Sequence, residues 1–411
     1  METLQVRVYN VLFGDAILIS IPDQNPNGEI ETRHVLIDVG NVLSKTKGGL
    51  DDVFKPVIKN ILEVLDGQPL DLYIMTHEHL DHVQGLPYGE EKIYLGSDDE
   101  LRQKLQTRHA WLTASAREGY YEDHPDAKKR KLELMRIYAE IDSYIRVRSA
   151  SREPILEAIK ALWMNNNPRK TADCVKYLRS IGENTSYVYR GFDSLNQSPF
   201  HEAKIEIWAP EENTAEYYGR FRPAFRALGV TRLSEGGRGK QSVIEPIPPQ
   251  GVDAGAFYNL VNSRKEIFES LLAIDKAANN TSVVFSLEWR GYRLLFTGDA
   301  EERSWKTMDK YGVLKPVHFL KVSHHGSHNG TPEPELLDKI LPLERPDEKP
   351  RYAIVATWKG TYQNVPDEET LSLICDRCDK LYYAQKENGE MRNLGDYVDI
   401  KFEAEGQEVP S

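Results

Sequence analysis

The feature that most constrains this chain is a cluster of metal-ligand side chains, His77-x-His79-x-Asp81-His82, which follows the apolar run Leu70 to Met75. A short apolar run bounded by polar residues predicts a buried strand, so the cluster begins where a strand ends. Histidines at alternate positions of an extended backbone project from the same side, and Asp81 and His82 follow as the chain turns. Surface histidines before a helix are the ordinary alternative, but chance seldom spaces so many ligands so closely.

Two further segments place ligand-type side chains after apolar runs. They are Thr297-Gly298-Asp299 and Ser323-His324-His325-Gly326-Ser327-His328. Imidazole and carboxylate suit zinc, manganese or iron, and the lack of thiolate in the cluster argues against a purely structural zinc site. We therefore predict a catalytic centre for two divalent metal ions, zinc in the first place and manganese as the alternative.

Strand and helix patterns alternate along the chain and predict an α/β (α+β) fold. Strands are expected at Leu4 to Val8, Ala16 to Ile21, His34 to Val39, Lys204 to Trp208, Ser282 to Trp289, Tyr292 to Phe296, Val317 to Val322 and Tyr352 to Ala356, and a helix at Asp51 to Leu65. From 98 to 190 the pattern changes to charged amphipathic segments, such as Lys128 to Arg148 and Pro154 to Met164. This change predicts a helical insertion. A Gly- and Pro-rich stretch, Gly236 to Gly255, is expected to form a long loop.

Length and charge narrow the class of protein. A chain of 411 residues allows one large decorated domain or two. The net charge of -12 provides no global attraction for polyanions, so any contact with nucleic acid must be local. The chain opens with no signal-peptide pattern and has no run approaching the ~20 apolar residues that span a bilayer. We therefore expect a cytoplasmic protein without membrane segments.

The pair Cys375-x-x-Cys378 has two interpretations. A structural zinc site normally needs four ligands, and the sequence has only one other cysteine, Cys174. The stretch Glu369 to Tyr382 has a helical period that places both cysteines on one face with Leu371 and Ile374. We therefore favour buried packing cysteines on a helix.

The histidine cluster is similar to the signature of the metallo-β-lactamase superfamily, and the chain resembles in particular the hydrolase domain of the competence protein ComEC. The matching segments occur in the family's order: Phe13-Gly14-Asp15-Ala16, Leu36 to Gly40, the cluster, Asn280 to Val284, Leu295 to Asp299 and Leu320 to Ser327. The resemblance implies a four-layered αββα sandwich with a two-metal site at one edge. We expect a single domain over residues 1–411, with the helical insertion of residues 98–190 inside it.

The resemblance also implies a role for each site residue. His77 and His79 would bind the first metal, Asp81 and His82 the second, and Asp299 would bridge both. One of His324 and His325 would complete the second site, and the sequence does not choose between them. Asp38 would orient a ligating histidine, although a strand-end turn aspartate is an equal alternative. His325 or His328 would protonate the leaving group, with a plain loop position as the other interpretation of His328.

Two departures from the family's pattern stand out. Many members supply a further histidine to the first metal from a Pro-Gly-His stretch, where this chain has Trp208-Ala209-Pro210 and Asn279-Asn280. The Tyr-Gly-His-Pro stretch of ComEC-like domains corresponds here to residues 362–366, without the histidine. The remaining histidines between the motifs, His109, His124 and His201, are expected at the surface.

Three functions remain open from the sequence. The first is hydrolysis of DNA or RNA phosphodiesters by a metal-bound hydroxide, supported by the resemblance and by basic residues such as Lys128 to Lys131 in the insertion. The second is hydrolysis of a small-molecule ester, thioester or cyclic nucleotide, which one scaffold can also support. The third is a metal-poor scaffold that binds a partner. The sequence does not settle substrate, partner proteins or oligomeric state.

Overall fold

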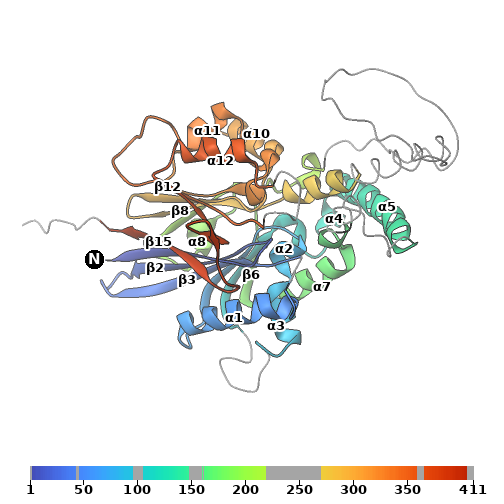
Figure 1. Cartoon of the computed structure of the whole chain (residues 1–411), viewed down its shortest axis with the longest axis horizontal. Coiled ribbons are helices and arrows are strands. Elements are labelled where there is room, and N and C mark those ends of the chain that lie inside the picture. The colour runs from blue at the N-terminus through green and yellow to red at the C-terminus, as the bar shows by residue number, and fades with distance from the viewer. Residues whose placement is uncertain are drawn as a thin grey trace, which may run out of the picture.

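The structure is a computed structural model that describes residues 2–42, 46–95, 105–147, 160, 162–218, 270–358 and 365–404. Within these ranges two mixed sheets form the centre of the molecule (Figure 1). The first sheet has the strand order β15-β1-β2-β3-β4-β5-β6, and the second has the order β14-β13-β12-β11-β10-β9-β8-β7. Each sheet has a parallel section, β3 to β6 in the first and β9 to β12 in the second. Antiparallel pairs lie on one side of this section in the first sheet, where β6 is the edge, and on both sides in the second.

The strands of the first sheet come from both ends of the chain. They are β1 (Thr3–Tyr9), β2 (Ala16–Gln24), β3 (Ile30–Val39), β4 (Leu70–Met75), β5 (Thr107–Thr113), β6 (Gly182–Val188) and β15 (Tyr397–Glu403). The second sheet contains β7 (Lys204–Ala209), β8 (Val284–Trp289), β9 (Tyr292–Phe296), β10 (Phe319–Lys321), β11 (Tyr352–Val355), β12 (Lys380–Tyr383), β13 (Lys386–Glu387) and β14 (Glu390–Met391).

Apolar side chains alternate between the two faces of each sheet. They form three apolar clusters, one between the two sheets and one between each sheet and its helices. The inner faces meet in one core, where Val6 and Ile37 pack in the same cluster as Phe285 and Leu294. The outer face of the first sheet is covered by α1 (Leu50–Leu65), α3 (Gly85–Glu91) and α7 (Pro168–Leu178). The outer face of the second is covered by α10 (Glu302–Lys310), α11 (Pro334–Ile340) and α12 (Glu368–Cys375). The predicted αββα sandwich is therefore confirmed.

The helical segment is narrower than the predicted range 98–190. Strands β5 and β6 lie near the two ends of that range and belong to the first sheet. Between them, the described helices include α4 (Tyr120–Asp123), α5 (Pro125–Val147) and α7. β6 carries no apolar alternation because it is a half-exposed edge strand. The predicted loop Gly236 to Gly255 and most of the predicted helix Pro154 to Met164 lie outside the described residues.

The predicted helix Glu369 to Tyr382 is wrong in its second half. Helix α12 ends at Cys375, and Lys380–Tyr383 instead forms β12, which pairs in parallel with β11. Cys375 is exposed and Cys378 is half-buried, so the buried packing predicted for the pair does not hold for Cys375. Lys380 to Tyr383 pair with Tyr352 to Val355, and this tertiary contact outweighs the local helical period.

Across the described ranges, no helix has both the length and the apolar character needed to cross a bilayer.

Candidate metal centre

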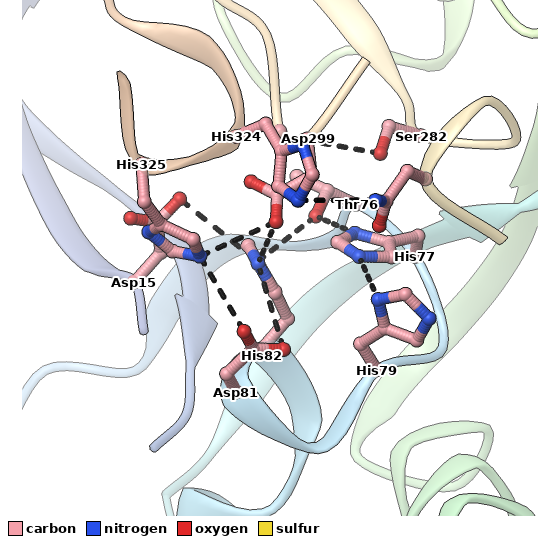
Figure 2. A network of polar contacts seen from close by, with 12 residues as sticks. Asp15, Thr76, His77, His79, Asp81, His82, Ser282, Asp299, His324 and His325 are labelled. Carbon is pink, nitrogen blue, oxygen red and sulfur yellow. Dashed lines mark hydrogen bonds and ion pairs between the residues drawn. The ribbon is translucent and has the colours of Figure 1, made fainter. Parts of the chain in front are cut away.

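Four loops at the ends of strands meet at one edge of the sandwich (Figure 2). The histidine cluster follows β4, Asp299 follows β9 and His325 follows β10, while Asp38 lies at the end of β3. Carboxyl ends of neighbouring strands converge on the same edge, which brings these distant segments together. The backbone joins the two sheets at this point, because Val283 N–H donates to Thr76 O at 2.9 Å.

Four buried side chains converge in the centre: Asp81, His82, Asp299 and His325. Asp299 Oδ2 lies 3.1 Å from His82 Nε2 and 3.3 Å from His325 Nε2. His325 Nε2 is also 3.4 Å from Asp81 Oδ2. One ligand atom of each residue lies within 4.8 Å of the others, so the group has the dimensions of a metal site.

Hydrogen bonds behind two of these histidines determine which ring nitrogen faces the centre. His82 Nδ1 lies 2.8 Å from Asp38 Oδ2, and His325 Nδ1 lies 2.8 Å from the Ala356 carbonyl oxygen. Both oxygens accept, so each Nδ1 carries a proton, and in the neutral ring that a metal requires each Nε2 would be the nitrogen with the lone pair. The resemblance assigned this orienting position to Asp38. The backbone φ angles of Asp38 and His325, 50° and 54°, are uncommon for non-glycine residues and place both side chains at the site.

His77 and His79 form a second pair beside this group. His79 Nε2 donates to Asn166 Oδ1 at 2.9 Å, which leaves Nδ1 as the nitrogen available to a metal. Thr76 Oγ1 donates to Asp38 Oδ2 at 2.6 Å and lies 3.1 Å from His77 Nδ1, so His77 Nε2 is the nitrogen that remains for a metal. His77 Nε2 and His79 Nδ1 lie 3.1 Å apart, within hydrogen-bonding distance of each other. Nitrogens bound at ~2.0–2.1 Å to one tetrahedral zinc are separated by about 3.3 Å, so the pair fits a single ion.

In the metal-free centre, protonated histidines balance the negative charge of the buried carboxylates. Burial alone lowers the pKa of His325, but Asp299 and Asp81 raise it to about 10. Burial likewise opposes the charged form of His82, yet Asp299 and Asp38 raise its pKa well above the usual value. Burial, together with the neighbouring imidazoles of His82 and His79, holds the pKa of His77 well below its ordinary value. His77 is therefore neutral, the form that binds a metal.

Several buried polar atoms at the centre have no hydrogen-bond partner among the described residues. They are Asp15 Oδ1, Asp81 Oδ1, His82 Nε2, Asp299 Oδ1 and His325 Nε2. Leaving such atoms unsatisfied costs folding free energy, so a cluster of them needs an explanation. A divalent cation would satisfy carboxylate oxygens and imidazole nitrogens together, and the residues present therefore fit a metal.

A buried lysine lies beside the centre, and the sequence analysis did not identify it. Lys321 Nζ contacts Asp15 Oδ2, donates to the Gly298 carbonyl at 3.1 Å and lies 3.6 Å from Asp299 Oδ1. Both Lys321 and Asp15 are almost fully buried. The only sequence signal was a lysine inside the apolar run Val317 to Val322. Asp15 N–H also donates to the Asp81 carbonyl at 3.1 Å, which ties this loop to the cluster.

The structure separates the two candidate histidines of the HHGS segment. His325 joins the buried group of four, whereas His324 lies in another group with Asp275 and Glu301. His324 Nδ1 is 3.4 Å from Glu301 Oε1, and its Nε2 is 3.2 Å from Asn279 Nδ2. Sequence reasoning did not foresee this second group, because Asp275 and the neighbouring Asn279 belong to the helical turns of residues 270–279.

The structure does not bring His328 to the centre. Its side chain is 78% exposed and lies 3.6 Å from Asp367 Oδ2. His109 and His124 are half-buried and His201 is exposed, and none of them is in a ligand group among the described residues. Asp299 does not cap the following helix, because the N-cap of α10 is Glu301.

Comparisons with known proteins give little beyond the architecture. No family model and no curated protein matches the sequence. Among solved structures, the chain is similar to the metallo-β-lactamase fold protein YhfI from Bacillus subtilis, with 8% identity and a TM-score of 0.35 over 97% of this chain and 100% of that one. It is also similar to a long form RNase Z from yeast, with 10% identity and a TM-score of 0.34 over 96% of this chain and 41% of that one. Similarity at this level carries no argument about the site.

Proposed function

We propose that this chain is a metal-dependent hydrolase that binds two divalent metal ions. The observation that carries the proposal is the buried group Asp81, His82, Asp299 and His325, whose facing atoms contact one another and include several that make no hydrogen bond among the described residues. In this assignment, His77 Nε2 and His79 Nδ1 hold the first ion, and the group of four holds the second with Asp299 between the two. Bound ions of this kind lower the pKa of a shared water and polarise the group under attack.

The buried charge supports two ions rather than one. Four carboxylates lie at or next to the centre, on Asp15, Asp38, Asp81 and Asp299, and the Lys321 ammonium offsets one of them. With neutral histidines, three negative charges remain. Two divalent cations and one hydroxide would balance that charge, as a buried site requires.

The chain's own residues orient the ligands and exclude water. Asp38, Asn166 and the Ala356 carbonyl accept the outward ring protons and so hold His82, His79 and His325 with their lone pairs inward. Each of these three histidines is at most 2% exposed. Because these side chains are already oriented, the reaction would need little reorganisation of the site.

Phosphodiesters are our first substrate class, with DNA or RNA as the polymer that the ComEC resemblance favours. A paired set of metals holds the attacking and leaving oxygens of a phosphoryl group at the same time. The basic run on α5 supports nucleic-acid binding less than its sequence indicated. Lys128 pairs with Glu122 at 3.1 Å and Lys131 lies 3.5 Å from Glu78, so both cations already have acidic partners. Zinc is the first choice of metal and manganese the alternative.

The second candidate is hydrolysis of a small-molecule ester, thioester or cyclic nucleotide. A cavity beside His79, described below, favours it. A metal-poor scaffold that binds a partner is the remaining alternative.

The test is elemental analysis followed by activity assays. We expect about two zinc or manganese ions per chain after loading, and metal-dependent release of nitrophenolate from bis(4-nitrophenyl) phosphate. Single-stranded and duplex DNA and RNA, assayed in parallel, test the nuclease assignment separately. A loaded protein with well under one ion per chain and no turnover would support the scaffold alternative.

A further inference from the structure

A cavity of about 60 Å³ borders the metal centre through His79. Its walls come from α5, from the start of α7 and from the helical turns of residues 270–279. In Figure 1, α5 and α7 lie at the same end of the sandwich as α2 (Leu80–Val83), which carries Asp81 and His82. The helical segment therefore contributes a space next to the centre, in addition to covering the sheet.

Among the described residues, this cavity touches the centre at His79, and the other candidate ligands are almost fully buried. His77, Asp81, His82, Asp299 and His325 are each at most 1% exposed. His79 lines the cavity, and so does Asn166, which accepts the hydrogen bond from its Nε2. A substrate bound at the first metal position through this cavity would have its remaining part between α5 and α7.

The chemistry of the lining selects the kind of group that fits. Leu134, Met135, Tyr138 and Ile274 provide an apolar surface. The two charged side chains, Lys131 and Glu78, lie 3.5 Å apart and offset each other, and Ser115 Oγ donates to Glu78 at 3.3 Å. A nucleic-acid strand is held by a groove of cations that follows its backbone. The described lining offers one cation, and that cation is already paired.

We propose that this cavity binds the uncharged apolar part of a small ester or phosphodiester substrate, while the bond to be cleaved lies at the metal centre. The inference rests on the proposed hydrolase function and specifies its substrate class. One water needs ~10–15 Å³ of cavity volume, so the cavity of about 60 Å³ has room for about four waters. A substituent about the size of an aryl ring matches this space.

The test measures binding and does not depend on turnover. Isothermal titration calorimetry compares phenylphosphonate with methylphosphonate on the zinc-loaded protein. Both probes present the same metal-binding oxygens, and only the first carries an aryl group. We expect phenylphosphonate to bind about tenfold more tightly, because its ring leaves water for the cavity.

Three variants locate the effect. Met135 and Leu132 both lie on α5 and are 43% and 48% exposed, but only Met135 lines the cavity. Met135→Asp should abolish the preference for phenylphosphonate, Leu132→Asp should keep it, and Met135→Leu should restore most of it. Methylphosphonate affinity should stay within about twofold in all three variants.

The outcomes separate this inference from the proposed function. Equal affinities for the two phosphonates, or a preference that survives Met135→Asp, overturn the cavity assignment even if diesters are hydrolysed. Preferential binding without hydrolysis of any diester supports the cavity and contradicts the hydrolase. Faster cleavage of DNA or RNA than of small aryl diesters would also overturn the inference, because the substrate would then be a polymer.

Discussion

The carboxylate of Asp299 lies between two imidazoles, within 3.1 Å of His82 Nε2 and 3.3 Å of His325 Nε2. We predict that Asp299→Asn lowers the metal content to about one ion per chain or less and lowers turnover more than about a hundredfold, because an amide does not neutralise two cations. Mass spectrometry of bound metal and steady-state assays measure both effects. The control is Asp309→Asn, which removes only a surface partner of Lys339. Unchanged metal content and turnover would show that Asp299 does not bridge.

Lys321 is a buried cation whose partners are carboxylates of the same centre. We predict that Lys321→Met lowers the free energy of unfolding by about 3–5 kcal/mol, because it leaves the buried Asp15 carboxylate without its counter-charge. Urea denaturation of the metal-loaded protein measures the change. Lys339→Met breaks an ion pair with Asp309 at the surface and should cost less than about 1 kcal/mol. Equal costs for the two variants would be inconsistent with a structural role for Lys321.

Proton binding gives the metal-free protein a characteristic pH dependence. Burial opposes the raised pKa of His325, but Asp299 and Asp81 raise it to about 10, whereas an unfolded histidine titrates near about 6.5. The stabilisation is therefore complete below about pH 6.5 and is lost as the pH rises towards 10. Urea denaturation should give a lower unfolding free energy for the metal-free protein at about pH 9.5 than at about pH 6.

Zinc should reverse part of this trend. Metal competes with the same ring protons, so the stabilisation that zinc adds should grow across the same window. A metal-free protein that becomes more stable with rising pH would contradict the charged His325–Asp299 pair.

At the scale of single elements, the sequence identified strands with apolar runs and missed those that depend on partners. The run Leu70 to Met75 is buried at every position and is β4 as predicted. β6 is a polar edge strand, and β12 exists because it pairs with β11. Local sequence carries the burial pattern of a fully buried strand such as β4, whereas half-exposed strands such as β6 and β12 are decided by the neighbour they pair with.

The loop after β3 is packed against the helix that carries two of the ligands. A Cβ on Gly40 would lie 2.1 Å from Asp81 C and 2.2 Å from His82 N. We predict that Gly40→Ala displaces α2, lowers the unfolding free energy by about 2–3 kcal/mol and lowers zinc content. Gly48→Ala is the control, because its Cβ meets only the carboxylate of the exposed Asp52. Equal zinc content in both variants would show that α2 tolerates the shift.

At the scale of the whole molecule, the sequence predicted the residues that chemistry singles out and missed those that only topology brings close. Histidines and aspartates after apolar runs were recognisable because ligand types are few. Asn166, Asp275 and Lys321 were not, since each is an ordinary residue until the fold places it beside a ligand. The orienting residues of a metal site therefore need the three-dimensional structure.

The position of the centre at one edge of the sandwich predicts how the whole protein responds to metal loss. The inner core and both outer layers are made of apolar clusters that do not include the ligand histidines. We predict that His79→Ala and Asp81→Asn abolish turnover while circular dichroism and the cooperative thermal transition remain, with the midpoint lowered by a few degrees at most. Treatment of the wild-type protein with EDTA should give the same result.

Readdition of zinc separates a catalytic from a structural role in this experiment. It should restore turnover to the EDTA-treated wild type and not to the variants, since their ligand sets remain incomplete. If chelation instead removes the cooperative transition, the metals hold the fold together. The centre would then be a structural site, because a closed core independent of the metal would have kept its transition.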